Sequence, residues 1–259
     1  MFETIKLDMQ DHVAILTLNR PDKLNAFTEQ MNTEVVKACK QVTKNPDARA
    51  LLITGEGRAF CSGEDLASVS DPEAINHGAF LRQRYNPMIQ AISRLEIPVV
   101  AAVNGAAAGA GCSLALACDF RIASTKASFI EAFIHIGLVP DSGSCYFLPR
   151  IVGWAKALEL AILGEKIKAE KAHDLGLVTQ VTEPAQLMEN AIAFATKLSL
   201  MPTKAIGLIK RTMAQGLQQD LDSTLELEAY AQEIAGKTQD HQEGVAAFME
   251  KRTPRFEGK

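Results

Sequence analysis

The stretch Val99 to Cys118, VVAAVNGAAAGAGCSLALAC, decides the fold class of this chain. Its length invites comparison with a membrane span, but it is mostly Ala and Gly and is interrupted by Asn104 and Ser113. A buried strand, a Gly-rich turn and a helix explain that composition better. We therefore expect this stretch to lie inside the protein, and we expect no membrane contact.

Apolar runs on both sides of this stretch extend the pattern. Runs rich in Val, Ile and Leu predict strands at residues 13–18, 50–54, 99–103, 120–123 and 178–181. Apolar residues at helical spacing predict helices at 28–42, 79–95, 154–163, 169–173, 185–198, 203–216, 221–235 and 244–251. Strands alternating with helices, followed by helices alone, predict an α/β fold with an all-helical C-terminal part.

Composition excludes several classes of protein. The chain has 259 residues, 47% of them hydrophobic, and a formal net charge of -4, which provides no general attraction for nucleic acid. The first residues, MFETIKLDMQD, carry charges where a signal peptide needs an apolar run. The chain has five Cys residues and no C-x-x-C pair, which disfavours a disulfide framework and a zinc knuckle. We expect a cytoplasmic protein without a metal site.

The central stretch partly matches two familiar motifs but departs from the pattern of each. Gly109 and Gly111 form a G-x-G, but Leu114 stands where a dinucleotide-binding loop has its third small residue. Ser113 resembles the serine of a nucleophile elbow, yet it falls about ten residues past the strand end rather than on a sharp strand-to-helix turn. Neither motif is predicted to function here.

Three segments in a fixed order carry the most specific pattern. They are LNRPDKLNAF (Leu18 to Phe27), GEGRAFCSGEDL (Gly55 to Leu66) and VNGAAAGAGCSLA (Val103 to Ala115). With this pattern the chain resembles the crotonase (enoyl-CoA hydratase/isomerase) superfamily over nearly its whole length, as far as the KRTPRF tail. The resemblance implies a crotonase-like spiral of ββα units with a C-terminal helical region. It divides the chain into an acyl-CoA-binding core, residues 1–200, and a helical oligomerisation region, residues 201–259.

The resemblance also implies the chemistry. Its substrates are acyl-CoA thioesters, coenzyme A enters as part of the substrate without another cofactor, and the assembly is a homotrimer or a dimer of trimers. Removing a proton beside a thioester carbonyl places negative charge on its oxygen, which preorganised N–H donors stabilise. By the family pattern these donors are the amides of Ser62 and Ala110, with Gly109 allowing close approach to the backbone. The small residues alone would equally suit tight packing of a helix on a sheet.

Further residues match the family's coenzyme A site. Arg20 and Lys23 match the loop along the pantetheine and diphosphate, and Cys61, Asp65 and Leu66 match the segment that accepts the adenine. Lys251, Arg252 and Arg255 in the tail could reach a phosphate, on this or a neighbouring subunit. Each charge taken alone is more typical of a solvated surface residue than of a phosphate contact.

In typical hydratases of this family, two glutamates bracket a water molecule. The sequence departs from that pattern at both positions. Ser113 and Phe133 occupy these two positions, and neither side chain can act as a general acid or base in their place. Glu131 lies two residues from the second position, so a local shift would restore one carboxylate but not the pair. We expect Phe133 to line the acyl pocket instead.

Asp141 is the alternative carboxylate. In relatives that move double bonds, notably dienoyl-CoA isomerases and the ring-isomerising enzymes of phenylacetate breakdown, an aspartate at this position is the acid/base. A helix N-cap is the competing interpretation, because Asp followed by Ser and Gly suits a cap. An apolar pocket would raise the pKa of Asp141 and favour proton shuttling.

Three functions therefore remain. The first is an acyl-CoA isomerase that shifts a double bond, or isomerises a ring-derived acyl group, through an enolate with Asp141 as acid/base. The second is an enoyl-CoA hydratase of fatty-acid β-oxidation in which Glu131 or Asp141 activates water. The third is an acyl-CoA-binding subunit without turnover. The loop from Ser68 to Arg84 is expected to shape the acyl pocket.

Overall fold

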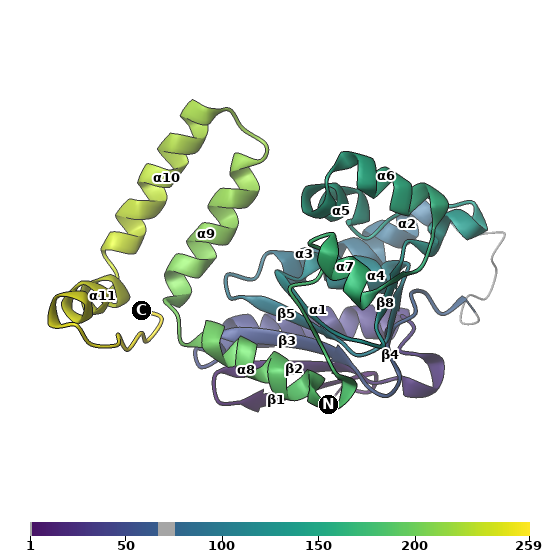
Figure 1. Cartoon of the computed structure of the whole chain (residues 1–259), viewed down its shortest axis with the longest axis horizontal. Helices are drawn as coiled ribbons and strands as arrows, with labels where there is room; N and C mark the ends of the chain where they lie inside the picture. The colour runs from purple at the N-terminus through teal and green to yellow at the C-terminus, as the bar shows by residue number, and fades with distance from the viewer. Residues whose placement is uncertain (1, 67–75) are drawn as a thin grey trace.

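The computed structural model describes residues 2–66 and 76–259, which contain two β-sheets (Figure 1). The larger sheet has the order β1 (Ile5–Gln10), β2 (Val13–Leu18), β3 (Ala50–Gly55), β5 (Val99–Val103), β7 (Phe120–Ser124) and β10 (Gln180–Thr182). The smaller has the order β4 (Ala59–Cys61), β6 (Ala106–Ala108), β8 (Ser128–Ile130) and β9 (Ile167–Lys168). Only the pairs β1–β2 and β8–β9 are antiparallel within these described sheets.

From β3 to β8, consecutive strands alternate between the two sheets. The pairs β3/β4, β5/β6 and β7/β8 each place their first strand in the larger sheet and their second in the smaller. The helices that follow these pairs are α3 (Asn86–Ser93), α4 (Ala110–Ala117) and α5 (Ser144–Val152). This repetition confirms the predicted spiral of ββα units.

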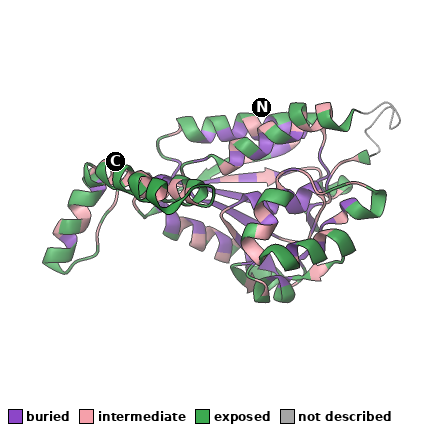
Figure 2. Cartoon of the chain, turned by 90° about the horizontal axis from the view of Figure 1, so that it is seen from above, coloured by how far each residue is buried: buried purple, intermediate pink, exposed green. Residues whose placement is uncertain are grey.

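The remaining helices cover the sheets or extend beyond them. They are α1 (Glu29–Lys44), α2 (His77–Phe80), α6 (Trp154–Leu163), α7 (Ala169–Asp174), α8 (Leu187–Ser199), α9 (Thr203–Gly216), α10 (Leu221–Gly236) and α11 (Gln239–Glu250). A π-helical turn, Leu81–Tyr85, joins α2 to α3, and short 3-10 turns span Pro21–Lys23, Ala132–Ile136 and Pro184–Gln186. Helices α9 to α11 project from the sheets and are largely exposed (Figures 1 and 2).

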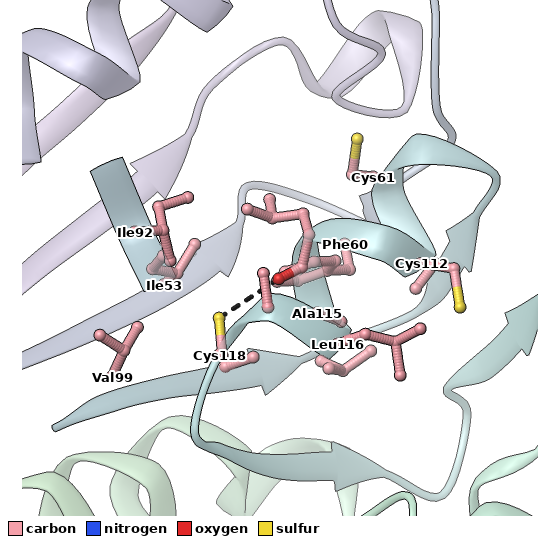
Figure 3. Close-up of a cluster of buried hydrophobic side chains, with 14 of the residues drawn as sticks. Ile53, Phe60, Cys61, Ile92, Val99, Cys112, Ala115, Leu116 and Cys118 are labelled. Carbon is pink, nitrogen blue, oxygen red and sulfur yellow. Dashed lines mark hydrogen bonds between the residues drawn. The ribbon is translucent and has the colours of Figure 1, made fainter. Parts of the chain in front are cut away.

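The central strands are buried on both faces, which explains their unbroken apolar sequences. In β3, Leu51 and Ile53 belong to the main core, whereas Ala50 and Leu52 pack in a second cluster that includes residues of α8. Figure 3 shows part of the main core around α4, which includes Cys61, Cys112 and Cys118. All five cysteines are free.

Arg49, at the start of the β3 segment, connects the sheet to the C-terminal helices. Its guanidinium donates to Thr203 Oγ1 at 3.0 Å, to the Met201 carbonyl at 2.9 Å and to the Phe256 carbonyl at 2.9 Å. The side chain is buried, and burial lowers its pKa, an effect that Asp240 and Glu257 oppose. This cation therefore fixes the point from which α9 departs and the tail that returns to it.

Several elements differ from the sequence predictions. Strands β1, β4, β6, β8 and β9 and helix α5 were not predicted, and all but β1 and α5 have only two or three residues. The last helix begins at Gln239 rather than at residue 244, because Thr238 caps it by accepting from His241 N–H at 3.1 Å. Periodicity cannot locate strands this short or an N-terminus fixed by one hydroxyl.

Among the described residues no single helix is long and apolar enough to cross a membrane. One pair, Pro184–Ser199 and Thr203–Gly216, passes that test of length and composition together, but it is bent by 97°.

Candidate active site

A pocket of about 390 Å³ lies beside the start of α4 and the α2–α3 segment. Backbone and side chains from four parts of the chain line it: the loop after β4, the α2–α3 segment, the start of α4, and the region before α5. The lining residues are Ser62, Gly63, Glu64, Leu66, His77, Phe80, Leu81, Tyr85, Gly109, Ala110, Ala132, Phe133, His135, Ile136, Leu138, Val139 and Asp141.

Two glycines bring the loop after β4 against the start of α4. A Cβ on Gly63, whose φ is 92°, would lie 2.9 Å from the Ala108 carbonyl oxygen. A Cβ on Gly111 would lie 2.2 Å from the Cys61 carbonyl oxygen. Both distances are shorter than van der Waals contact, so a larger residue at either position would push the two segments apart. The absence of these side chains allows amides of both segments to face one pocket.

Ala110 provides one of these amides. It is the first residue of α4, so its N–H has no partner inside the helix, and it bonds to no other described residue. The positive end of the helix dipole adds to the attraction for negative charge at this point.

The second amide differs from the sequence expectation. Ser62 N–H donates to the Leu24 carbonyl at 3.1 Å, so it is already occupied. Glu64 lies opposite Phe27 in a parallel bridge, in which Phe27 bonds to Gly63 O at 2.7 Å and to Asp65 N at 3.0 Å. The N–H of Glu64 therefore points away from Phe27, and among the described residues it has no partner.

Asp141 lines the same pocket. Its Oδ1 accepts from Ser142 Oγ at 2.7 Å, and its carbonyl accepts from Ser144 N–H at 3.0 Å. Helix α5 begins at Ser144 with Gly143 at the cap and no side-chain cap bond, so the N-cap interpretation of Asp141 is wrong. Burial raises the pKa of Asp141, and the bond from Ser142 and the nearby His77 oppose this shift. Ser142, at φ 52°, holds a conformation that non-glycine residues seldom adopt.

Glu131 lies behind the pocket rather than in its lining. Its Oε1 accepts from Ser144 Oγ at 2.9 Å, and Ser144 Oγ lies 2.9 Å from Ser113 Oγ. Burial raises the pKa of Glu131 to about 7, although hydrogen bonds from Ser144 and Cys112 oppose the shift. Neither Glu131 nor Ser113 is in contact with the pocket that holds Asp141.

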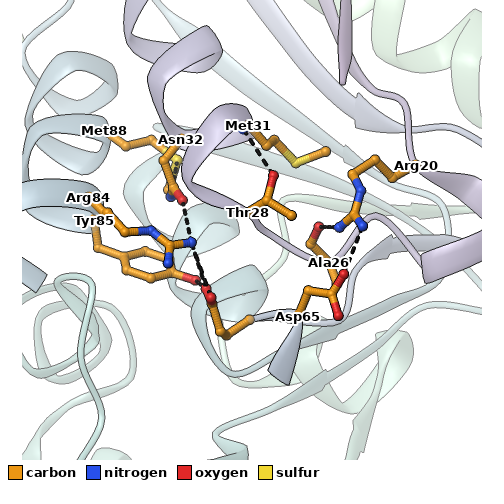
Figure 4. A network of polar contacts seen from close by, with 10 residues as sticks. Arg20, Ala26, Thr28, Met31, Asn32, Asp65, Arg84, Tyr85 and Met88 are labelled. Atoms are coloured by element: carbon orange, nitrogen blue, oxygen red, sulfur yellow. Dashed lines mark hydrogen bonds and ion pairs between the residues drawn. The ribbon is translucent and has the colours of Figure 1, made fainter. Parts of the chain in front are cut away.

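Some of the residues expected to bind coenzyme A line the pocket, and the others lie outside it. Leu66, Gly109 and Phe133 line the pocket. Arg20 is committed to an ion pair, 2.7 Å from Asp65 Oδ2, and also donates to the Ala26 carbonyl (Figure 4).

The other expected positions lie outside the pocket lining. The Cys61 thiol is buried and donates to the Asn25 carbonyl at 3.1 Å. Lys23 is exposed and forms no ion pair with any residue that the structure describes. Lys251 ends α11, at the opposite end of the protein from α2 (Figure 1).

Sequence reasoning missed a second carboxylate in the pocket. Glu64 accepts from the Tyr85 hydroxyl and from Arg84 Nη2, which lies 3.1 Å from Oε1 (Figure 4). Burial raises the pKa of Glu64, while Tyr85 and Arg84 oppose the shift. Its position beside Asp65 gave no sign of this, because its partners lie about twenty residues away. Of the loop expected to shape the pocket, residues 68–75 lie outside the described residues, and residues 77–84 are helical.

Comparison with known proteins identifies the class that this geometry suggests. Residues 8–259 match the enoyl-CoA hydratase/isomerase family, and the chain belongs to that family. It is 42% identical to 1,2-epoxyphenylacetyl-CoA isomerase of Escherichia coli (strain K12) over 100% of both chains. It is 37% identical to crotonyl-CoA hydratase of Syntrophomonas wolfei over 98% of both. An enoyl-CoA hydratase structure from Bacillus anthracis matches with a TM-score of 0.92 and 34% identity, covering 99% of this chain and 100% of that one.

Proposed function

We propose that this enzyme is an acyl-CoA isomerase that moves a double bond through a thioester enolate, with Asp141 as acid and base. The observation that carries the proposal is that Asp141 and the amides of Glu64 and Ala110, which have no hydrogen-bond partner among the described residues, meet at one apolar pocket. The mechanism requires no cofactor beyond the coenzyme A of its substrate.

The proposed reaction consists of two proton transfers by Asp141, with an enolate between them. The Asp141 carboxylate takes a proton from C2 of a 3-enoyl thioester, and the electron pair moves onto the thioester oxygen, which the two N–H groups stabilise. Protonated Asp141 then returns the proton to C4, and the double bond ends between C2 and C3. Because one carboxyl group performs both transfers, a second acid or base is unnecessary.

Hydration is the second candidate, and the similarity to crotonyl-CoA hydratase favours it. Adding water requires a group that activates the water and a group that protonates C2. Glu131 lies behind the pocket, and both oxygens of Glu64 face Tyr85 or Arg84. Asp141 would have to do this alone, which makes hydration the weaker proposal. A binding subunit without turnover is the third candidate, and an acid/base poised in the pocket argues against it.

The acyl group is proposed to be ring-derived or otherwise apolar. Phe80, Leu81, Phe133 and Ile136 surround the space beside Asp141. The similarity to 1,2-epoxyphenylacetyl-CoA isomerase suggests a place in phenylacetate breakdown. Aromatic side chains at the edge of such a pocket would pack against a planar ring.

We also propose that the C-terminal helices join copies of the chain into a homotrimer or a dimer of trimers. Leu217, Leu221 and Leu225 near the α9–α10 turn, and Phe248 and Met249 on α11, are exposed. Such a contact would also bring Lys251 toward the coenzyme A of a neighbouring copy. Sedimentation velocity tests this, because a monomer at micromolar concentration would exclude it.

The activity is tested by supplying the purified protein with a 3-enoyl-CoA and, separately, with crotonyl-CoA. The proposal predicts conversion of the first to its 2-enoyl isomer and little hydration of the second. Glu131→Gln serves as a control, because a hydratase that used Glu131 would lose its activity and this isomerase would keep it. Rapid hydration of crotonyl-CoA without isomerisation would contradict the proposal.

A further inference from the structure

We propose that the Glu64 carboxylate is a positioning group: held by Tyr85 and Arg84, it fixes the direction of the Glu64 N–H toward the substrate oxygen. The inference rests on the proposed function, in which that N–H stabilises the enolate. It adds Tyr85 and Arg84 to the residues on which turnover depends, although we assign neither a proton transfer.

The side chain of Glu64 is held at both oxygens. The Tyr85 hydroxyl donates to Oε2, and Arg84 Nη2 lies 3.1 Å from Oε1 and 3.3 Å from Oε2. The same nitrogen lies 3.4 Å from Asn32 Oδ1 on α1 (Figure 4). Tyr85 is only 2% exposed, and the side chains of Arg84 and Glu64 are 13% and 16% exposed. Water therefore has little access with which to replace these bonds.

The main chain of Glu64 is held from the other side. Phe27 bonds to Gly63 and Asp65, the residues on either side of Glu64. This bridge restrains the segment from the side of Phe27 alone. The Glu64 side chain, bonded to Tyr85 and Arg84, adds a restraint from a different element. The two restraints together determine where the N–H points.

The anchor is also part of the pocket wall. Tyr85 and Arg84 lie in the π-helical turn, a feature frequent at functional sites. Arg84 stacks on Phe80 at 4.1 Å from the ring centroid, and Phe80, Leu81 and Tyr85 line the acyl pocket. An acyl group in the pocket would therefore contact the same turn that holds the Glu64 side chain.

Charge supplies a second reason for Arg84. An uncompensated carboxylate beside the developing enolate would oppose its formation, since like charges repel strongly in a poorly solvated site. Pairing with Arg84 neutralises Glu64 and holds its carboxylate at the pocket edge. Turnover should therefore depend on the cation as well as on the tyrosine hydroxyl.

The experiment measures the carbonyl that the amide is proposed to polarise. Infrared difference spectra of hexanoyl-CoA, labelled with 13C at the thioester carbon, report the C=O stretch of the bound, non-reacting thioester. Wild-type protein should lower its frequency. In Tyr85→Phe and in Arg84→Met we expect that shift to be at least halved. For a 3-enoyl-CoA, we expect kcat to fall roughly 10- to 100-fold with KM changed by no more than about 3-fold.

Arg82→Met is the matched control, since Arg82 lies in the same turn, carries the same charge and is exposed. It should leave the carbonyl shift and kcat unchanged. If Tyr85→Phe does not fold, Arg84→Met and Arg84→Lys decide the question. A full shift in folded Tyr85 or Arg84 variants would overturn the positioning role and leave the proposed function intact. No shift in wild-type protein would instead contradict the proposed oxyanion contact itself.

Discussion

Ser113 Oγ lies 3.1 Å from the main-chain oxygen of Asp141, so a hydroxyl inside α4 holds the residue proposed as acid and base. The same helix begins with the Ala110 amide. One helix therefore fixes the distance between the proposed donor for the thioester oxygen and the proposed base for the adjoining carbons.

Ser113→Ala should weaken both stability and turnover. The buried partners of the hydroxyl would lose a hydrogen bond, at a cost of about 1–3 kcal/mol in the free energy of unfolding, measured in urea. Without this bond Asp141 should move from its position, and we expect kcat to fall roughly 10-fold. In an Asp141→Asn background, Ser113→Ala should have no further effect on kcat. A further fall there would show that Ser113 does not act through Asp141.

Asp141→Asn should lower turnover by at least about 100-fold while binding of acyl-CoA is retained, because the amide cannot exchange the proton. Isothermal titration with hexanoyl-CoA measures the binding. The raised pKa of Asp141 also predicts the pH dependence. Activity should fall as pH falls through that raised value, because only the carboxylate takes a proton. Residual activity above a tenth of wild type would remove Asp141 from the mechanism.

Glu131 should make the protein less stable as pH rises. Its pKa in the folded protein is about 7, against an ordinary 4.5, so the folded state holds this proton more tightly than the unfolded chain. Its stabilising contribution is therefore complete below about pH 4.5 and is lost by about pH 7, a change of about 3 kcal/mol. Glu131→Gln should flatten this slope in urea titrations, and Glu226→Gln on exposed α10 should not. Equal slopes in wild type and Glu131→Gln would contradict the assignment.

Gly63→Ala should abolish most turnover because the new Cβ meets the Ala108 carbonyl and separates the two amides. We expect kcat to fall at least 10-fold, because one of the two N–H donors would no longer lie within hydrogen-bond distance of the thioester oxygen. Gly176→Ala is the control, since Gly176 also has a positive φ, 75°, but nothing within 4 Å of the added Cβ. It should cost about 1 kcal/mol of stability and leave kcat unchanged. The same loss of kcat in both variants would mean that strain, and not the clash, is responsible.

The fold could be predicted from sequence wherever a segment was long enough to show a period. Strands β2, β3 and β5 and helices α8, α9 and α10 fall where their apolar patterns placed them. Strands β4, β6 and β8 each have three residues, so the second sheet became visible only through the family resemblance.

The site was predictable in part for the same reason. Asp141 and Ala110 lie together in the pocket as expected, because both belong to contiguous motifs. Which amide faces the pocket beside that of Ala110 depends on which residue lies opposite Phe27. A one-residue change in this register would turn the Glu64 N–H from the pocket toward the Phe27 segment. The anchoring of Glu64 by Arg84 and Tyr85 joins distant segments, which no local pattern in the sequence encodes.

A crystal structure of the protein with hexanoyl-CoA bound tests the central claim most directly. The account predicts the thioester oxygen about 2.7–3.1 Å from the amide nitrogens of both Glu64 and Ala110, with a carboxylate oxygen of Asp141 facing C2 and C4 of the acyl chain. A thioester oxygen bound elsewhere, or an acyl chain out of reach of Asp141, would contradict it.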